Sequence, residues 1–412
     1  QQGPGPDGWY IQLPLVPTEA GVQQMEARDR IATRASLYAF FHPRSVAVIG
    51  ASRDPSRIGA QVLANLIASN FQGPVYPVNP KASFVMSVPA YPSVLDIPGP
   101  VDLAVVAVPT GAVLDVVRQC AQKGVRALIV LTAGFAETGP EGAEAQKQLV
   151  DLVRGSGMRM IGPNCLGLIH CHPDVQLNAT FSATPVRPGN LAMSSQSGAL
   201  GLAVLEYARE LGIGFSSFVS VGNKADVSGN DLLQWWEEDE RTKAILLYLE
   251  SFGNPRRFAR LARRVGRRKP IIAVKGGRTV AGQRAAGSHT AALASDDVVV
   301  DALFRQSGVI RTRTLQEMFD VAALIAHQPL PRGNRVAILT NAGGPAILCA
   351  DVCEGEGLSL PTLPGDVQER LKALLPPAAS TANPVDMIAG ATAGEYRRCL
   401  EILLESDACD AV

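Results

Sequence analysis

Residues 45–52 read Ser-Val-Ala-Val-Ile-Gly-Ala-Ser, and this stretch decides the fold. It is a short apolar run that ends in glycine, followed by a loop and a helical stretch over residues 58–70. A strand that is buried on both faces of a parallel sheet has this continuous apolar character. Four more apolar runs leave room for helices between them: 75–78, 103–108, 127–131 and 158–161. The alternation predicts an α/β fold, a Rossmann-like parallel sheet with right-handed crossovers.

The same alternation begins again near Asn190 and once more at Arg335. We therefore expect three α/β domains after an N-terminal arm or linker, the second and third being flavodoxin-like parallel-sheet domains. The expected segments are the arm at 1–37, the Rossmann-like domain at 38–175, and the two later domains at 176–328 and 333–412. Because an apolar strand would be starting at residues 411–412, the last domain is expected to be truncated.

Composition narrows the function classes. Lys plus Arg and Asp plus Glu both total 38, so the chain lacks the basic surplus of a general nucleic-acid binder. The arginine-rich stretch 256–269 is better explained as the solvated face of an amphipathic helix. No uncharged apolar run is long enough for a membrane span, and the N-terminus does not have the pattern of a signal peptide. The seven cysteines form no CxxC pair and no metal-ligand spacing, which favours a cytoplasmic protein with reduced thiols and no metal site.

The first predicted strand ends in Gly50-Ala51-Ser52, a glycine turn into a helix. Free backbone N–H groups and the helix dipole make such a turn a phosphate site. The second strand leads to Lys81, at a place where an NAD site carries an acid for the ribose. A lysine there suits an additional phosphate, so coenzyme A fits better than NAD. A purely structural turn is the alternative for these residues taken alone.

Further loops follow the later strands of this domain, at the sheet edge where open α/β sheets bind ligands. The candidate residues in these loops are Val108, Pro109, Thr132, Ala133, Gly134, Asn164 and Cys165. Cys165 could be a nucleophile. Because no histidine is placed by the sequence to activate it, a structural or ligand-lining role is favoured.

Two later helix starts are predicted anion cradles: Ser195-Gln196-Ser197-Gly198 in the second domain and Asn341-Ala342-Gly343-Gly344 in the third. His289 lies in a loop of small residues, Gly287–Leu293, where its imidazole could act as a nucleophile near neutral pH. Glu250 ends an apolar run and could orient that ring. Taken alone, Glu250 could equally be a solvent-facing acid, and His289 an incidental surface residue. The other four histidines are expected to be structural or superficial, and Trp235-Trp236 to pack a helix or an interface.

Together these residues resemble the NDP-forming acyl-CoA synthetases, relatives of succinyl-CoA synthetase. The resemblance covers residue 38 to the end and is carried by the following stretches: 41–52, 77–81, 132–137, 162–167, 195–198, 287–293 and 341–344. It implies a first domain that binds CoA or acetyl-CoA and two domains that cradle a phosphate. It further implies that His289 is phosphorylated and that Glu250 orients it.

The activity implied by the resemblance is that of an acid–thiol ligase, an acetate–CoA ligase of the ADP-forming type. ADP or ATP and Mg²⁺ would bind an ATP-grasp domain or subunit outside this chain, and the protein is expected to be an oligomer. The loop differs from the family pattern at Ala291 and Ser295, where glycine is usual, so its swing could be altered. The alternative is a CoA-sensing or acyl-CoA-sensing region of a protein lysine acetyltransferase, with a GNAT domain fused through the arm.

Overall fold

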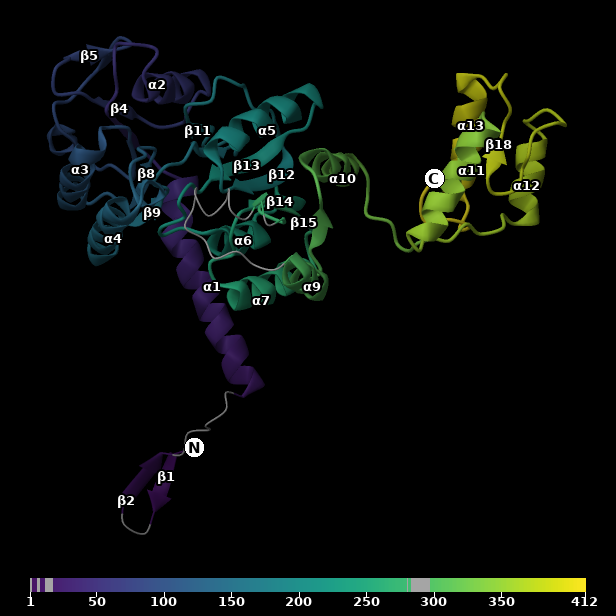
Figure 1. Cartoon of the computed structure of the whole chain (residues 1–412), viewed down its shortest axis with the longest axis horizontal. Coiled ribbons are helices and arrows are strands. Elements are labelled where there is room, and N and C mark those ends of the chain that lie inside the picture. The colour runs from purple at the N-terminus through teal and green to yellow at the C-terminus, as the bar shows by residue number, and fades with distance from the viewer. Residues whose placement is uncertain (1, 6–7, 12–17, 280, 283–296) are drawn as a thin grey trace. The chain divides into compact units, whose positions relative to one another are not determined.

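The computed structural model describes residues 2–5, 8–11, 18–279, 281–282 and 297–412. The chain forms two compact units, Gln1–His327 and Gln328–Val412, and Figure 1 traces both along the chain. At the N-terminus, β1 (Gln2–Gly5) and β2 (Gly8–Ile11) pair as an antiparallel hairpin. His289, Ala291 and Ser295 lie outside the described residues.

The first domain is built on a five-stranded sheet with the order β4-β3-β7-β8-β9, and every neighbouring pair in it is parallel. Its strands are β3 (Val46–Ile49), β4 (Val75–Val78), β7 (Leu103–Val106), β8 (Ala127–Val130) and β9 (Arg159–Ile161). A small antiparallel hairpin, β5 (Phe84–Val85) and β6 (Val88–Pro89), follows β4. The Rossmann-like sheet predicted from residues 45–52 is confirmed.

Helices cover both faces of this sheet. They are α1 (Glu19–Phe41), α2 (Ile58–Ala68), α3 (Thr110–Lys123) and α4 (Pro140–Gly155). Strand residues alternate between the faces, because successive side chains of a strand point to opposite sides. Ala47 and Ile49 pack in a core with α3 and α4, whereas Val46 and Val48 pack in another with α1 and α2.

The second sheet has seven strands in the order β11-β10-β13-β12-β14-β15-β16. The strands are β10 (Gly167–His170), β11 (Leu177–Thr180), β12 (Pro188–Ser195), β13 (Phe215–Ser220), β14 (Ala244–Leu249), β15 (Ile271–Lys275) and β16 (Ile310–Thr312). From β13 through β12 to β16 the neighbours are parallel, as expected. β10 is antiparallel to both β11 and β13, so the sheet is mixed.

This finding moves the expected boundary at 175/176, since both antiparallel strands belong to the second sheet although they begin at Gly167. The local pattern of this segment is weak, because each strand is only four residues long and Pro173 lies between them. Leu168 and Ala179 nevertheless face the core that the two domains share.

The helices of the second domain are α5 (Gly198–Glu210), α6 (Gly229–Glu238), α7 (Pro255–Val265), α9 (Asp297–Ser307) and α10 (Leu315–His327). α5 and α10 contribute to the core on one face of the sheet, and α6, α7 and α9 to the core on the other. Trp235 and Trp236 are both buried, as expected, and the Trp236 indole donates a hydrogen bond to Ser217 Oγ at 2.7 Å. The buried residues of α7 are apolar, as expected. Its arginine face is not simply solvated, because Arg257, Arg260 and Arg264 form ion pairs with residues of α1 and α6.

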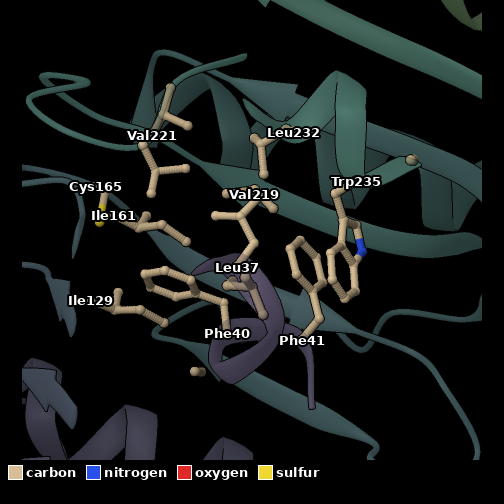
Figure 2. Packing of buried hydrophobic residues seen from close by; sticks show 14 of the residues in the cluster. Leu37, Phe40, Phe41, Ile129, Ile161, Cys165, Val219, Val221, Leu232 and Trp235 are labelled. Carbon is tan, nitrogen blue, oxygen red and sulfur yellow. The ribbon is translucent and has the colours of Figure 1, made fainter. Parts of the chain in front are cut away.

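Residues 19–37 of the expected arm are the first part of a helix that reaches the core. α1 begins at Glu19 and continues to Phe41, past the expected boundary at residue 37, and ion pairs join it to α6 and α7 through Arg30–Glu238 and Glu26–Arg260. Its last turn inserts Leu37, Phe40 and Phe41, each fully buried, between the two sheets. Figure 2 shows Phe40 beside Ile129 and Ile161, and Phe41 beside Trp235. The sequence did not predict that this helix enters the core, because most residues in the first part of α1 are polar.

The second unit contains α11 (Gly343–Gly355), α12 (Gly365–Lys372) and α13 (Ala393–Glu405), with the short parallel strands β17 (Leu339–Thr340) and β18 (Val385–Asp386). Its own core includes Leu363, Leu371 and Leu403. Across the described part of the chain, none of the helices has the length and apolar character of a membrane span.

Replacing Phe40 with alanine tests the role of α1. Because Phe40 is fully buried where the two sheets meet, we expect Phe40→Ala to lower the free energy of unfolding by about 3–5 kcal/mol in denaturant titrations. Ile31→Ala is the matched control, because Ile31 is 68 % exposed on the same helix, and its change should stay within about 0.5 kcal/mol. Equal effects of the two substitutions would contradict the insertion of α1 into the core.

Candidate functional site

The glycine turn after β3 brings backbone from three elements into close contact. Gly50 has φ +94°, and a side chain there would meet the carbonyl of Ala107. A Cβ atom on Gly59 would lie 2.1 Å from the carbonyl oxygen of Gly50. Only glycine allows such an approach. The N-terminus of α2 therefore lies directly against the turn, which is the arrangement that exposes free N–H groups to a phosphate.

The second strand of this domain supports the same turn. Asn79 donates a hydrogen bond from Nδ2 to the carbonyl of Ala51 at 2.7 Å and accepts one from the Lys81 backbone at 2.8 Å. Lys81 is exposed beside it. A cavity of about 860 Å³ opens at this edge and is lined by residues that include Gly50, Ala51, Ser52, Val108 and Pro109. Lys81 is not among the lining residues, but it follows Pro80, which is.

A second cavity, of about 610 Å³, joins the two domains of the first unit. It shares Ile58, Ala107 and Val108 with the first cavity. Its lining brings together most of the remaining predicted residues: Thr132, Ala133, Asn164 and Cys165 from the first domain, and Gln196, Ser197, Gly198 and Glu250 from the second. The sequence could not place these loops opposite one another, because they belong to different sheets.

Gln196 holds the predicted anion cradle against the strand that ends at Glu250. Its amide oxygen accepts the backbone N–H groups of Glu250 and of Ser251, the latter at 2.7 Å. Ser197 caps α5 by accepting the N–H of Leu200 at 3.2 Å. Ser195 lies fully buried beneath the turn and donates to the Ser197 carbonyl at 2.8 Å. The free N–H groups at the start of α5 and the Glu250 carboxylate therefore lie at one site.

Two lysines that sequence reasoning missed, Lys224 and Lys275, interact electrostatically with Glu250. Lys224 donates to the carbonyl and to the hydroxyl of Ser251, at 2.8 and 2.7 Å. Burial lowers the pKa of Lys224 to about 8, and the positive charge of Lys275 acts in the same direction, against the opposing effect of Glu250. Burial also lowers the pKa of Lys275, again against Glu250. Asp297 acts on Lys275 in the same direction as Glu250, and neither lysine is among the residues that line the cavity.

Cys165 is not a reactive thiol. It is 4 % exposed and donates a weak hydrogen bond from Sγ to the carbonyl of Val130. Burial raises the pKa of the Cys165 thiol to about 12, and a thiol is nucleophilic only as thiolate. The geometry therefore agrees with a role in lining the cavity rather than in attack.

Sequence reasoning also missed Gly222 and Asn223. Both residues contact the loop of the first domain at this site. A side chain on Gly222 would lie 2.3 Å from the carbonyl oxygens of Pro163 and Asn164. Asn223 donates its backbone N–H to Pro163 at 2.9 Å and accepts from the Asn164 side chain at 3.3 Å. Their position could have been predicted from the sequence, because residues 222–224 follow strand β13 at the edge of the sheet where ligands bind in open α/β folds.

Not all predicted site residues meet. Gly134 has φ +100° and donates its N–H to Glu137 at 2.6 Å, but it does not line either cavity. Asn341 and Ala342 lead into α11, whose first residues are Gly343 and Gly344. All four belong to the second unit, whose position relative to the first is not defined. Among the described residues, no cluster of His, Cys, Asp and Glu side chains is arranged to hold a metal ion.

Three protein-family models match the chain in succession. A CoA binding domain matches residues 44–171, a succinyl-CoA ligase like flavodoxin domain residues 188–325, and a ligase-CoA domain residues 336–412. Each match falls within one of the three expected domains. The first domain is therefore a CoA-binding domain and not an NAD-binding domain.

Similar proteins extend over most of the chain. The alpha subunit of acetate–CoA ligase [ADP-forming] II from Pyrococcus furiosus is 46% identical over 372 residues, which are 90% of this chain and 80% of that relative. Acetate–CoA ligase [ADP-forming] I from Archaeoglobus fulgidus is 42% identical, over 90% of this chain and 53% of its own length.

A solved structure agrees with these relatives. It is the dinucleotide forming acetyl-coenzyme A synthetase 1 of Ca. Korarchaeum cryptofilum in complex with phosphate and ADP, which superposes with a TM-score of 0.87 at 41% identity. The match covers 91% of this chain and 80% of that one. The chain belongs to the family of alpha subunits of ADP-forming acetate–CoA ligases, acid–thiol ligases related to succinyl-CoA ligase.

Proposed function

We propose that this chain performs the CoA and phosphohistidine steps of an ADP-forming acyl-CoA synthetase, with His289 as the phosphoryl carrier. The observation that carries the proposal is the cavity of about 610 Å³ in which the CoA-side loops meet Gln196–Gly198 and Glu250. A thioester at the end of a CoA molecule bound along the first cavity would enter the second, which continues from it through Val108.

The chemistry at this site has two steps. A phosphate oxygen attacks the acyl carbonyl, the carbon–sulfur bond breaks, and CoA leaves as the thiolate. An imidazole nitrogen of His289 then attacks the phosphorus of the acyl phosphate, and the carboxylate leaves. Positioning and neutralisation of charge provide most of such catalysis. The N-terminus of α5, Lys224 and Lys275 would supply these effects, while Glu250 would orient the imidazole by a hydrogen bond.

The nucleotide step requires a partner. We place ADP or ATP, together with Mg²⁺, on an ATP-grasp subunit or domain outside this chain, where a β-phosphate oxygen of ADP would take the phosphoryl group from His289. The printed name of the Pyrococcus furiosus relative, a subunit alpha, supports a second subunit. The residues 341–344 would provide a second helix N-terminus for the phosphoryl group. The acetyltransferase-linked sensor gains no support from the relatives compared above, which are ligases and a synthetase.

Binding of CoA can be tested through Gly59. We expect CoA to bind the full chain with micromolar affinity in calorimetry and Gly59→Ala to weaken it at least tenfold, since the new methyl group would displace α2 from the Gly50 turn. Gly111→Ala is the matched control, because a Cβ atom at Gly111, also in the first turn of a helix, meets nothing within 4 Å. Binding of NAD without CoA would refute the assignment.

The carrier role predicts an acid-labile phosphate on His289 after incubation with acetyl-CoA and phosphate. The label should disappear in His289→Ala and remain in His327→Ala, whose histidine ends α10. We expect Glu250→Gln to slow labelling about 10–100-fold, by analogy with the loss of a hydrogen-bond partner that orients a metal-ligating histidine. A label that survives in His289→Ala would show that another residue carries the phosphoryl group.

The lowered pKa of Lys224 predicts a fall in activity at alkaline pH, which would appear as a descending limb in the pH profile. Since burial lowers the pKa of Lys224 from its usual 10.5 to about 8, its charge is present below that pH and is lost above it. We expect kcat/KM for phosphate to fall above about pH 8 and Lys224→Met to lower it roughly 10²-fold at pH 7. In Lys224→Arg the limb should move to higher pH, because arginine stays protonated. Lys243→Met, at an exposed lysine before β14, is the control. An unchanged limb in Lys224→Arg would exclude Lys224 as its origin.

A further inference from the structure

A chain of hydrogen-bonded side chains crosses the boundary between the two domains of the first unit, beside the cavity of about 610 Å³. Asn164 lies in the loop after β9, and Asn223 lies in the loop after β13. Asn164 donates from Nδ2 to Oδ1 of Asn223 at 3.3 Å, and both residues line the cavity. Asn223 in turn donates to Glu137 and to Gln146. The reaction steps proposed above give no role to these four side chains.

Glu137 fixes the direction of this chain, because an ionised carboxylate only accepts hydrogen bonds. One of its oxygens accepts the backbone N–H groups of Gly134 and Phe135, at 2.6 and 3.2 Å. Burial acts to raise the pKa of Glu137, but the hydrogen bonds from Asn223 and from the two backbone groups outweigh this effect, so the pKa is lowered. The carboxylate is therefore ionised at neutral pH, and its other oxygen requires a donor from Asn223.

This requirement determines how both asparagine amides are turned. An asparagine has two donor hydrogens on Nδ2 and an acceptor at Oδ1. Both hydrogens of Asn223 are used, because Nδ2 donates to Glu137 and, at 2.9 Å, to Oε1 of Gln146. Oδ1 of Asn223 then faces Asn164, which has to present its own Nδ2. The opposite orientation of Asn223 would set its oxygen against the carboxylate.

One N–H of Asn164 remains for a ligand. Within the described part of the chain, Nδ2 of Asn164 has a single acceptor, Oδ1 of Asn223. The backbone keeps the side chain in place, because the Asn164 N–H donates to the carbonyl of Thr132 at 3.0 Å. The φ angle of Asn164 is +56°, a conformation in which asparagine is enriched. The cavity is therefore lined by an amide whose donor end is set in advance.

The loop of Asn164 lies directly against the proposed phosphate site. A Cβ atom on Gly198, the first residue of α5, would lie 3.5 Å from the backbone nitrogen of Leu166 and 3.8 Å from the carbonyl carbon of Cys165. In the proposed reaction, phosphate at the start of α5 attacks the acyl carbon, and negative charge develops on the carbonyl oxygen. Donors that are oriented before the reaction stabilise such an oxyanion.

We propose that Asn164 donates its remaining N–H to the carbonyl oxygen of the acyl group, and that Glu137 and Asn223 are positioning residues for Asn164. The inference rests on the proposed function. When the phosphate oxygen bonds to the acyl carbon, the π electrons of the carbonyl move to its oxygen, where the N–H of Asn164 stabilises them. They return to the carbonyl as the carbon–sulfur bond breaks and CoA leaves as the thiolate. The amide keeps its proton throughout.

The choice of phosphoryl donor separates the two steps. Acetyl-CoA with labelled phosphate labels His289 through both steps, whereas labelled acetyl phosphate does so through the second step alone. Asn164→Asp keeps the size of the side chain and exchanges the donor for an acceptor. In the full chain we expect it to slow labelling from acetyl-CoA about 10²–10³-fold, the usual loss for an oxyanion donor, and labelling from acetyl phosphate less than about threefold.

The two donors also distinguish this inference from the proposed function. An effect of the added negative charge on phosphate binding would slow both reactions of Asn164→Asp equally, and equal slowing would overturn the inference. A wild-type chain that is labelled by neither donor would refute the phosphohistidine proposal, and this inference with it. Calorimetry provides a further readout, because CoA itself has no acyl carbonyl. Loss of CoA binding in Asn164→Asp would overturn the inference.

An exchange of polarity tests the positioning role of Glu137. Glu137→Gln and Asn223→Asp should each slow labelling from acetyl-CoA about 10–100-fold, since small displacements of a stabilising group have effects of this size. The double variant should recover most of that loss, because the new amide donates to the new carboxylate, whose other oxygen accepts from Asn164. Glu141→Gln, at an exposed acid in the first turn of α4, is the control. A double variant no faster than the slower single variant would exclude the positioning role.

Discussion

The burial of the last turn of α1 is the constraint on which the first unit depends. Leu37, Phe40 and Phe41 lie in one continuous apolar cluster to which both sheets contribute. Because protein interiors are packed as densely as organic crystals, the sheets cannot shift independently while these side chains are in place. The ligand-binding edges of the two sheets are thereby held at a fixed distance, and a cavity persists between them. Figure 2 shows the contacts that hold this geometry.

Hydrogen bonds between loops at the edge of the sheets also hold the two domains in place. Gln196 joins the start of α5 to the end of β14, and Asn223 joins β13 to the loop of Asn164. The Gln196 amide oxygen and the Pro163 carbonyl accept backbone N–H groups that these loops would otherwise expose, so the loops are preorganised. Preorganised donors are what a reaction with developing negative charge requires.

Charged side chains lie at both ends of the second sheet, and their neighbours determine the local charge. At one end, the Glu250 carboxylate acts electrostatically on the ammonium groups of Lys224 and Lys275, and Asp297 acts on Lys275 as well. At the other end, Glu237 and Glu238 are paired with arginines, and Asp239 accepts the hydroxyl group of Thr242. The net charge of the chain is zero, so the charge at each of these two places is set by local pairing and burial.

The sequence by itself determined the α/β class, the order of the three domains and the loops that carry chemistry, because buried parallel strands and glycine turns are local patterns. It also predicted Gln196, Glu250 and the CoA-side loops as candidate site residues, since the carboxyl ends of parallel strands meet at one edge, and the structure places them around one cavity. Only the tertiary structure decided that residues 19–37 of the expected arm belong to a helix that reaches the core, that β10 and β11 belong to the second sheet, and that Asn164 meets Asn223. Those facts depend on contacts between residues far apart in the chain, and no local periodicity encodes such contacts.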